Sequence, residues 1–344
     1  MHWTVAAPFI HNLKTDGEWL VPYIPGDRHQ FSLTPRAKPL ANWHTRSSSA
    51  TDYQEWLVYL QQGKNAVKET DGGVVTVFPQ LASAVGIQQR ICRRRIPVVA
   101  WLFNVGTCPT GMRRWLAQAS LQDIDRFVVH TRRECDIYSQ WLGLPKERFE
   151  FLPYQVSDIP ITYSENTTQP FVTAIGSAHR DFSTLFTAIA KLNFSTVIAS
   201  GPRALAGLEL PTCAQAPLGI VKADCLRLAQ EACINVVPLL PNERVTAAGQ
   251  VTIVEAMRMG RVVIASRCNG IEDYIIHGET GLLVEPQSVE DLMQALDLLW
   301  NDQELRNRLG QNAMQYAAQH FSDEAAGRGL SKILDELEES IHQK

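Results

Sequence analysis

A glycine-led helix start, with a carboxylate further along the same helix, is the part of this 344-residue sequence best suited to chemistry. Gly249 precedes a helical pattern of apolar residues, and Glu255 lies within that pattern. The first N–H groups of a helix have no partner inside the helix and lie at the positive end of its dipole, which suits a diphosphate. An acidic side chain about one turn into the helix can reach the ribose diol of the same nucleotide. The pattern therefore predicts a nucleotide diphosphate site.

The segment after this helix predicts a second ligand-facing loop. Gly260 ends the helix, residues 261–266 read as a buried strand, and Asn269, Gly270 and Ile271 follow it. Because α/β proteins bind ligands at the carboxyl ends of parallel strands, these three residues are expected to contact the ligand. The alternative is a plain tight turn. The glycines of the Gly278-Glu279-Thr280-Gly281 turn are expected to form the turn rather than to bind.

The order of these parts resembles the nucleotide-sugar half of GT-B glycosyltransferases, specifically the retaining family 4. The sequence pattern that carries this resemblance is EAM…G-x-V-V-I-A-S…G…GETGLLV. The resemblance implies an α/β protein with two Rossmann-like, doubly wound domains and a cleft between them. It implies transfer of a sugar from a nucleotide diphosphate sugar to a hydroxyl acceptor, a glycan or a lipid-linked glycan, with retention of anomeric configuration. The donor is a substrate, and no metal or other cofactor is expected.

The resemblance also assigns roles to individual residues. Glu255 matches the second member of an acidic pair and would bond the nucleotide ribose. In the loop after the first strand of the second half, Arg180 most nearly matches a lysine that holds the donor diphosphate, and Ser177 stands where an arginine is usual. One guanidinium can bind phosphate in a bidentate way, so Arg180 is also the predicted catalytic cation. The remaining donor-binding residues are Gly176, Gly249, Gln250, Val251 and Thr252.

Two further positions depart from the family pattern. Ala247 stands where the first glutamate of the pair is expected, which leaves recognition of the donor sugar open; Glu243 is the nearest acidic substitute but lies four residues out of register. Asn104, after an expected strand of the first half, stands where relatives often have a histidine, and it is the second predicted catalytic residue. Asn104 can form hydrogen bonds but cannot act as a general base. Generic candidates in the first half are His11, His44 and His130.

Both halves of the chain read as alternating strands and helices, which predicts right-handed βαβ units and parallel sheets. The expected domains are residues 1–162, residues 163–321, and a terminal helix over 322–344 that crosses back to the first domain or lies on the surface of the second. A polar stretch at 163–170 is the expected linker. The expected strands are 2–9, 73–78, 96–103, 126–130, 171–176, 196–200, 234–239 and 261–266.

Charge is divided unevenly between the halves. Residues 1–160 carry 18 Lys and Arg against 14 Asp and Glu, a balance of +4, whereas residues 161–344 carry 14 against 22, a balance of −8. Basic residues at 93–95 and 113–114 lie among Trp101, Phe103 and Trp115. This pattern favours docking of the first domain on an anionic lipid surface or lipid-linked acceptor, or else a solvated charged loop.

Other classes lack their signatures in this sequence. There is no G-x-G-x-x-G after a strand, no P-loop and no H-E-x-x-H, and none of the seven cysteines forms a CxxC pair. We therefore expect reduced thiols in a cytoplasmic protein, peripheral at the inner face of a membrane if the basic residues dock there, and no nucleic-acid partner. Two alternatives stay open: a GT-B-shaped binding or partner subunit without catalysis, and a nucleotide-sugar epimerase or phosphorylase.

Overall fold

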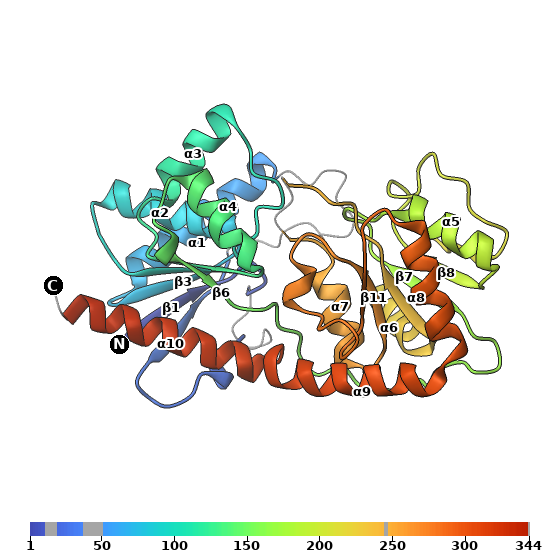
Figure 1. The fold of residues 1–344 in the computed structure, drawn as a ribbon. Helices are drawn as coiled ribbons and strands as arrows, with labels where there is room; N and C mark the ends of the chain where they lie inside the picture. The colour runs from blue at the N-terminus through green and yellow to red at the C-terminus, as the bar shows by residue number, and fades with distance from the viewer. Residues whose placement is uncertain (11–18, 37–50, 244–246, 343–344) are drawn as a thin grey trace. The chain divides into compact units, whose positions relative to one another are not determined.

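The chain forms two compact units in a computed structural model that describes residues 1–10, 19–36, 51–243 and 247–342. The first unit comprises Met1–Leu152 and Ala326–Lys344, and the second comprises Pro153–Ala325 (Figure 1). The boundary expected after residue 162 lies further along the chain than the boundary in the structure. Most of the terminal helix groups with the first unit.

Backbone hydrogen bonds explain where the second unit begins. The N–H of Tyr154 donates to the Tyr274 hydroxyl over 2.8 Å, and the N–H of Val156 donates to the Phe321 carbonyl over 2.9 Å. Further on, the side-chain oxygen of Gln230 accepts the N–H of Thr162. The segment 153–162 is therefore bonded into the second unit although it has no regular secondary structure. Its composition carries no sign of these bonds, because they are made by backbone groups.

The first unit is built on a six-stranded parallel sheet with the strand order β2-β1-β3-β4-β5-β6. The strands β3, β4 and β5 are almost entirely buried and rich in valine, as expected for a parallel sheet that is covered on both faces. The strand β2 was not among the expected strands, because its alternating polar residues give only a weak signal. The elements are β1 (His2–Ala6), β2 (Gln30–Thr34), α1 (Tyr53–Glu69), β3 (Gly73–Val77), α2 (Pro79–Cys92), β4 (Val98–Trp101), α3 (Gly111–Leu121), β5 (Arg126–Val129), α4 (Arg132–Leu142) and β6 (Phe149–Phe151).

The terminal helix α10 (Asp323–His342) packs along the first unit through a stripe of buried apolar residues at Leu330, Ile333, Leu334 and Leu337. These positions recur every three or four residues and so share one helical face. The approach is close at the start of the helix, where a Cβ added at Gly327 would run into the carbonyl of Tyr23. Packing of this face, rather than intrinsic helix propensity, holds α10 in place.

The second unit is built on another six-stranded parallel sheet, with the order β12-β11-β10-β7-β8-β9. The chain adds strands on one side of β7 as far as β9 and then returns to add β10, β11 and β12 on the other side. The strand order therefore reverses between β7 and β10, and the carboxyl ends of these two strands form the switch point where such sheets bind ligands. The elements are β7 (Val172–Ile175), α5 (Phe182–Leu192), β8 (Thr196–Ala199), β9 (Ala214–Gln215), α6 (Lys222–Glu231), β10 (Ile234–Val237), α7 (Gln250–Arg258), β11 (Val263–Ser266), β12 (Leu282–Val284), α8 (Val289–Asn301) and α9 (Gln303–His320).

The His130 ring is a structural part of the first unit. The ring is buried after β5, and its Nδ1 donates to the carbonyl of Leu152 over 2.9 Å. Burial lowers the pKa of His130 to about 4, from an ordinary value of 6.5, because the charged imidazolium loses its water. The position and the neutral state of the ring favour a structural role over acid–base chemistry. His11 and His44 lie outside the described residues.

This pKa predicts acid sensitivity. The folded pKa of His130 is lower than the unfolded one, so below about pH 6.5 the unfolded chain binds a proton that the folded chain refuses. The stability is therefore complete above about pH 6.5 and falls as the pH drops toward 4, by about 3 kcal/mol in total. Urea unfolding at several pH values measures this loss. His130→Asn keeps an amide donor near the Nδ1 position without titrating, and it should flatten that slope; an unchanged slope would contradict the assignment.

Candidate nucleotide-binding site

The loop after β7 and the end of β10 are joined directly at the switch point. The N–H of Asp181 donates to the Pro238 carbonyl over 3.0 Å, and the N–H of Leu240 donates to the His179 carbonyl over 3.0 Å. Arg180 lies between these two bonds and forms an isolated antiparallel bridge with Leu239. The two strand ends are therefore hydrogen-bonded to each other, and the backbone of Arg180 lies between these bonds.

The guanidinium of Arg180 is buried and folds back on the end of β7. Its Nε and Nη2 donate to the carbonyl of Ile175 over 3.2 and 3.0 Å, and its Nη1 donates to the carbonyl of Ala178 over 3.0 Å. Its Nη2 also donates to Thr252 Oγ1 over 3.2 Å. Burial lowers the pKa of Arg180 to about 10, so the group keeps its charge at neutral pH. No carboxylate among residues 1–10, 19–36, 51–243 and 247–342 forms an ion pair with it.

Gly176 makes this arrangement possible. Its φ is +103°, and a Cβ at this position would collide with the guanidinium of Arg180. Both facts restrict the position to glycine. Gly176 therefore leaves room for the Arg180 guanidinium, and its predicted contact with the donor stays a prediction.

The N-terminus of α7 lies against the same guanidinium. Gly249 is the N-cap residue, with a φ of +92°, and has no side chain to cap the first turn. Thr252, in that turn, accepts the bond from Arg180, and Val251 beside it is 38% exposed. A buried cation without an acidic partner in the described chain thus lies beside the positive end of a helix dipole. Both features favour an anion at this place.

Glu255 follows Thr252 by three residues and so lies on the same face of α7, roughly 4.5 Å further along the axis at about 1.5 Å per residue. Its carboxylate forms an ion pair with Nζ of Lys222 at the start of α6. The Glu255 side chain is 14% exposed and that of Lys222 is 55% exposed. Arg180 contacts Thr252 and Lys222 contacts Glu255, so the two cations lie one helical turn apart along α7.

Lys222 was missed by the sequence reasoning. It is the first residue of α6, where a cation is disfavoured by the positive end of the helix dipole. A lysine at this unfavourable position was the sequence signal that could have identified the residue. In the structure, Glu255 of the neighbouring helix compensates the misplaced charge.

Other predicted donor-binding side chains make bonds within the protein. The Gln250 side chain donates to the carbonyl of Asn269, and Asn269 in turn donates to the carbonyl of Leu240 over 3.0 Å. Ile271 is fully buried, and Ser177 Oγ accepts the N–H of Gly201 over 2.8 Å. These residues join the loops around the switch point. Their predicted contact with a ligand, together with that of Gly270, stays a prediction.

Asn104 and Ala247, which depart from the family pattern, are less buried than Arg180. Asn104 is exposed beyond the end of β4 in the first unit, and its side-chain oxygen accepts the N–H of Gly106 over 2.7 Å. Ala247 is half-buried ahead of α7, and Glu243 is exposed. The segment between Glu243 and Ala247 lies outside the described residues. The catalytic role of Asn104 and a substitute role for Glu243 stay predictions.

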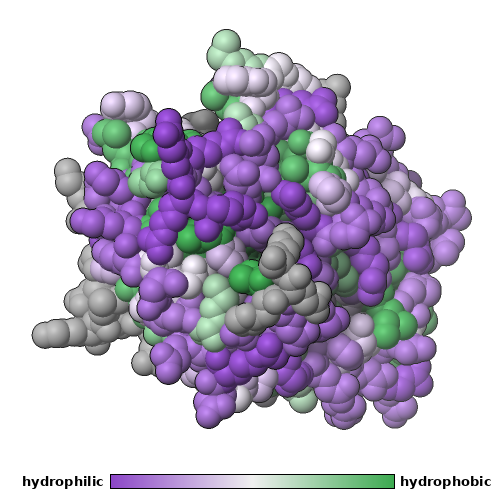
Figure 2. Space-filling view, turned by 90° about the vertical axis from the view of Figure 1, so that its left-hand side faces the viewer, coloured by the Kyte–Doolittle hydropathy of each residue, from purple (hydrophilic) through white to green (hydrophobic). Residues whose placement is uncertain are grey.

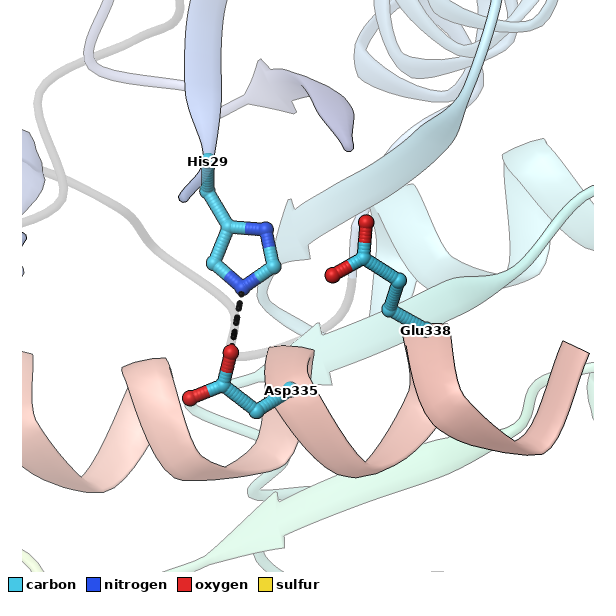
Figure 3. Close-up of side chains that lie close together, drawn as sticks. All are labelled: His29, Asp335 and Glu338. Atoms are coloured by element: carbon cyan, nitrogen blue, oxygen red, sulfur yellow. Dashed lines mark hydrogen bonds and ion pairs between the residues drawn. The ribbon is translucent and has the colours of Figure 1, made fainter. Parts of the chain in front are cut away.

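A separate cluster in the first unit brings together the side chains of His29, Asp335 and Glu338 (Figure 3). Their ligand atoms lie within 4.8 Å of one another. Trp3 Nε1 can only donate, and it donates to His29 Nδ1 over 3.3 Å, so the ring proton is on Nε2 and points at Asp335 over 3.1 Å.

Arg28 already balances the charge of this cluster. Its guanidinium contacts Asp335 at 2.9 Å and Glu338 at 2.7 Å. Because the ring nitrogen facing the cluster carries a proton and a cation lies among the carboxylates, the arrangement suits docking of α10 better than binding of a metal.

The family model that matches this chain covers part of the second unit. Residues 240–316 match the family model described as Glycosyl transferases group 1. An alpha-D-kanosaminyltransferase of Streptomyces kanamyceticus is 36% identical over 87 residues, which cover 25% of this chain and 22% of that protein. The N,N'-diacetylbacillosaminyl-diphospho-undecaprenol alpha-1,3-N-acetylgalactosaminyltransferase of Campylobacter jejuni is 28% identical over 120 residues, which cover 35% of this chain and 30% of that protein. The matches thus span less than a third of these relatives.

Solved structures match over the whole chain. Sucrose-phosphate synthase of Thermosynechococcus elongatus has a TM-score of 0.69 at 17% identity, covering 99% of this chain and 100% of that one. HepE of Anabaena in complex with UDP has a TM-score of 0.66 at 15% identity, covering 98% and 100%. The fold is therefore GT-B, with two Rossmann-like parallel sheets, as the sequence predicted.

Replacing Gly176 tests whether the Arg180 guanidinium needs the space that a glycine leaves at this position. Gly176→Ala combines backbone strain at positive φ with a collision, whereas Gly278→Ala has a φ of +79° and nothing within 4 Å of the added Cβ. We expect about 1 kcal/mol of destabilisation at Gly278 and clearly more at Gly176. Urea unfolding of both variants measures the difference, and equal losses would mean that Arg180 moves aside freely.

Proposed function

We propose that this protein is a retaining glycosyltransferase of family 4, which transfers a sugar from a nucleoside diphosphate sugar to a hydroxyl acceptor. The observation that carries the proposal is the Arg180 cation, buried at the switch point against the N-terminus of α7 without an acidic partner in the described chain. Leaving such a cation buried costs free energy, and a diphosphate would compensate it. The match of residues 240–316 to group 1 glycosyltransferases covers α7 and supports the same function.

The proposed chemistry is electrostatic. When the glycosidic bond breaks, negative charge grows on the departing diphosphate, where Arg180 and the first amides of α7 stabilise it. The acceptor hydroxyl attacks from the face that the diphosphate leaves, and the diphosphate takes its proton, which preserves the anomeric configuration. This route needs no nucleophile from the protein. Asn104 would supply a hydrogen bond to the sugar but no base. No metal is needed in this route, because Arg180 and the helix supply the positive field.

A donor screen tests the function. Uridine and guanosine diphosphate sugars are each mixed with the protein, and both the melting temperature and the release of nucleoside diphosphate are followed. HepE has been solved with UDP and with UDP-glucose, so the uridine series comes first. A rise in melting temperature with slow release of UDP supports a transferase. Binding without release, even with added glycan acceptors, would favour a partner subunit, and no binding by any donor would reject the proposal.

Arg180→Lys should weaken binding of the nucleoside diphosphate at least tenfold. The lysine ammonium keeps the charge but cannot donate the two parallel hydrogen bonds of a planar guanidinium. Calorimetry measures the affinity, and circular dichroism checks the fold. Arg267→Lys is a matched control, since Arg267 is an exposed arginine of the same unit paired with Glu285 at 3.3 Å. Unchanged affinity in the folded Arg180→Lys variant would remove Arg180 from the diphosphate site.

We further propose that the first unit docks on an anionic membrane that carries the acceptor. Three of the five arginines at 93–95 and 113–114 also bond within the protein. Arg94 donates to the carbonyls of Val67 and Thr70, Arg95 pairs with Asp125, and Arg114 donates to the carbonyl of Trp141. These three arginines are therefore tied into the fold. Arg93, Arg95, Arg113 and Arg114 are all exposed.

The start of α3 supplies the apolar part of that surface. Met112, Trp115 and Leu116 are 79%, 63% and 53% exposed, and their spacing puts them on one face of the helix beside Arg113. Figure 2 shows apolar side chains at the top of the face toward the viewer, over this part of the first unit. Tryptophan beside cations is typical of a membrane–water interface. None of the described helices is long and apolar enough to span a bilayer.

Replacing Met112, Trp115 and Leu116 together by serine should abolish flotation with vesicles of anionic lipid, because the surface loses its apolar contact. Arg93→Gln with Arg113→Gln should weaken it partly, by about 1 kcal/mol per charge at low salt. The matched control replaces Leu208, Leu210 and Leu218 of the second unit, which are also exposed, by serine. Flotation that survives the α3 replacement, or that is equal with neutral vesicles, would contradict this surface.

A further inference from the structure

The ion pair of Lys222 with Glu255 occupies the carboxylate that the proposed function assigns to the ribose. The two residues are 33 positions apart and come from the first turn of α6 and the second turn of α7. Glu255 Oε1 accepts from Lys222, and the carboxylate belongs to a side chain that is still 14% exposed. Lys222 is about half exposed, so its remaining N–H groups can reach a ligand without leaving Glu255.

The site of Lys222 argues against an ordinary surface ion pair. Exposed pairs contribute little to stability, and this lysine also opposes the dipole of its own helix. Cys225, one turn along α6, lies close enough to both charges for its pKa to respond to them. The pKa of Tyr154 is raised by burial and, to a smaller extent, by the charge of Glu255. Lys222 is therefore the cation held next to Glu255, between α6 and α7.

A vicinal diol needs both partners of such a pair. Each ribose hydroxyl donates one hydrogen bond and accepts others. A carboxylate alone can only accept, and an ammonium alone can only donate. Glu255 and Lys222 together therefore match the 2′- and 3′-hydroxyls of a ribose, and Lys222 also offsets the repulsion between Glu255 and the diphosphate.

We infer that Lys222 is a specificity-determining residue of the donor site, which with Glu255 selects ribonucleoside over deoxyribonucleoside diphosphates. This inference rests on the proposed function. The geometry agrees with it, because Thr252 and Arg180 lie one turn of α7 from Glu255, toward the helix N-terminus where the diphosphate would bind. The ribose end of the nucleotide then falls beside Lys222.

The test compares UDP with 2′-deoxy-UDP and 3′-deoxy-UDP by calorimetry. All three carry the same charge, so the ratio of their affinities isolates the hydroxyl contacts from general attraction. The wild-type protein should bind UDP at least tenfold more tightly than either deoxy form, since hydrogen bonds to charged groups are among the stronger ones. Lys222→Met should weaken binding of UDP about tenfold and clearly lower the ratio, and Glu255→Gln should also lower the ratio.

Two further variants serve as a rescue and as a matched control. Lys222→Arg restores a cationic donor and should restore most of the ratio. Arg227→Met removes the other cation of α6, which lies 3.9 Å from Asp224, and should leave the ratio unchanged. Melting temperatures verify that each variant is folded.

The outcomes separate the inference from the function on which it rests. If the wild-type protein binds no nucleoside diphosphate, with GDP tested beside UDP, the proposed function fails. If UDP binds and Lys222→Met keeps the wild-type ratio, the function stands and the role of Lys222 is wrong. Tighter binding of UDP by Lys222→Met would likewise overturn the inference, because Lys222 would then only compete with the ribose.

Discussion

The second unit is organised around the guanidinium of Arg180. Four hydrogen bonds from this group join the end of β7, the loop that follows it and the first turn of α7. The cost is a buried charge that lacks an acidic partner in the part of the chain the structure describes. The glycine at 176 and the close bonding of the β7 and β10 ends both serve this placement. An apolar residue here would avoid the cost of burying this charge, and the buried charge therefore supports the proposed anion site.

The residues along α7 extend the proposed anion site toward a place for the ribose of the proposed nucleotide. Arg180 and Thr252 offer positive potential near the helix N-terminus, and Glu255 with Lys222 offers acceptor and donor one turn later. Helical spacing fixes the distance between the two ends. The side chains of Gln250 and Asn269 bond to backbone carbonyls of the surrounding loops and so hold those loops together.

In the first unit, the terminal helix α10 packs on elements that lie far from it in the sequence. An apolar stripe on α10 is buried, and Arg28 and His29 contact Asp335 and Glu338 on the same helix. The Trp3 bond to His29 decides which ring nitrogen carries the proton, and this makes the cluster a docking contact. The apolar face at the start of α3 is left uncovered in the same unit, which sets it apart from the buried helix faces.

The sequence by itself determined the fold class, the valine-rich parallel strands and the glycine-led helix with Glu255. Each of these is a local pattern: a buried run, a cap or a spacing along one helix. Only the tertiary structure decided that Arg180 turns back onto Ile175, that Arg94, Arg95 and Arg114 are used within the first unit, and that Lys222 meets Glu255. Such pairings join residues that are distant in sequence or bond to backbone carbonyls. Composition and periodicity carry no record of either, because the packing of whole elements brings these groups together.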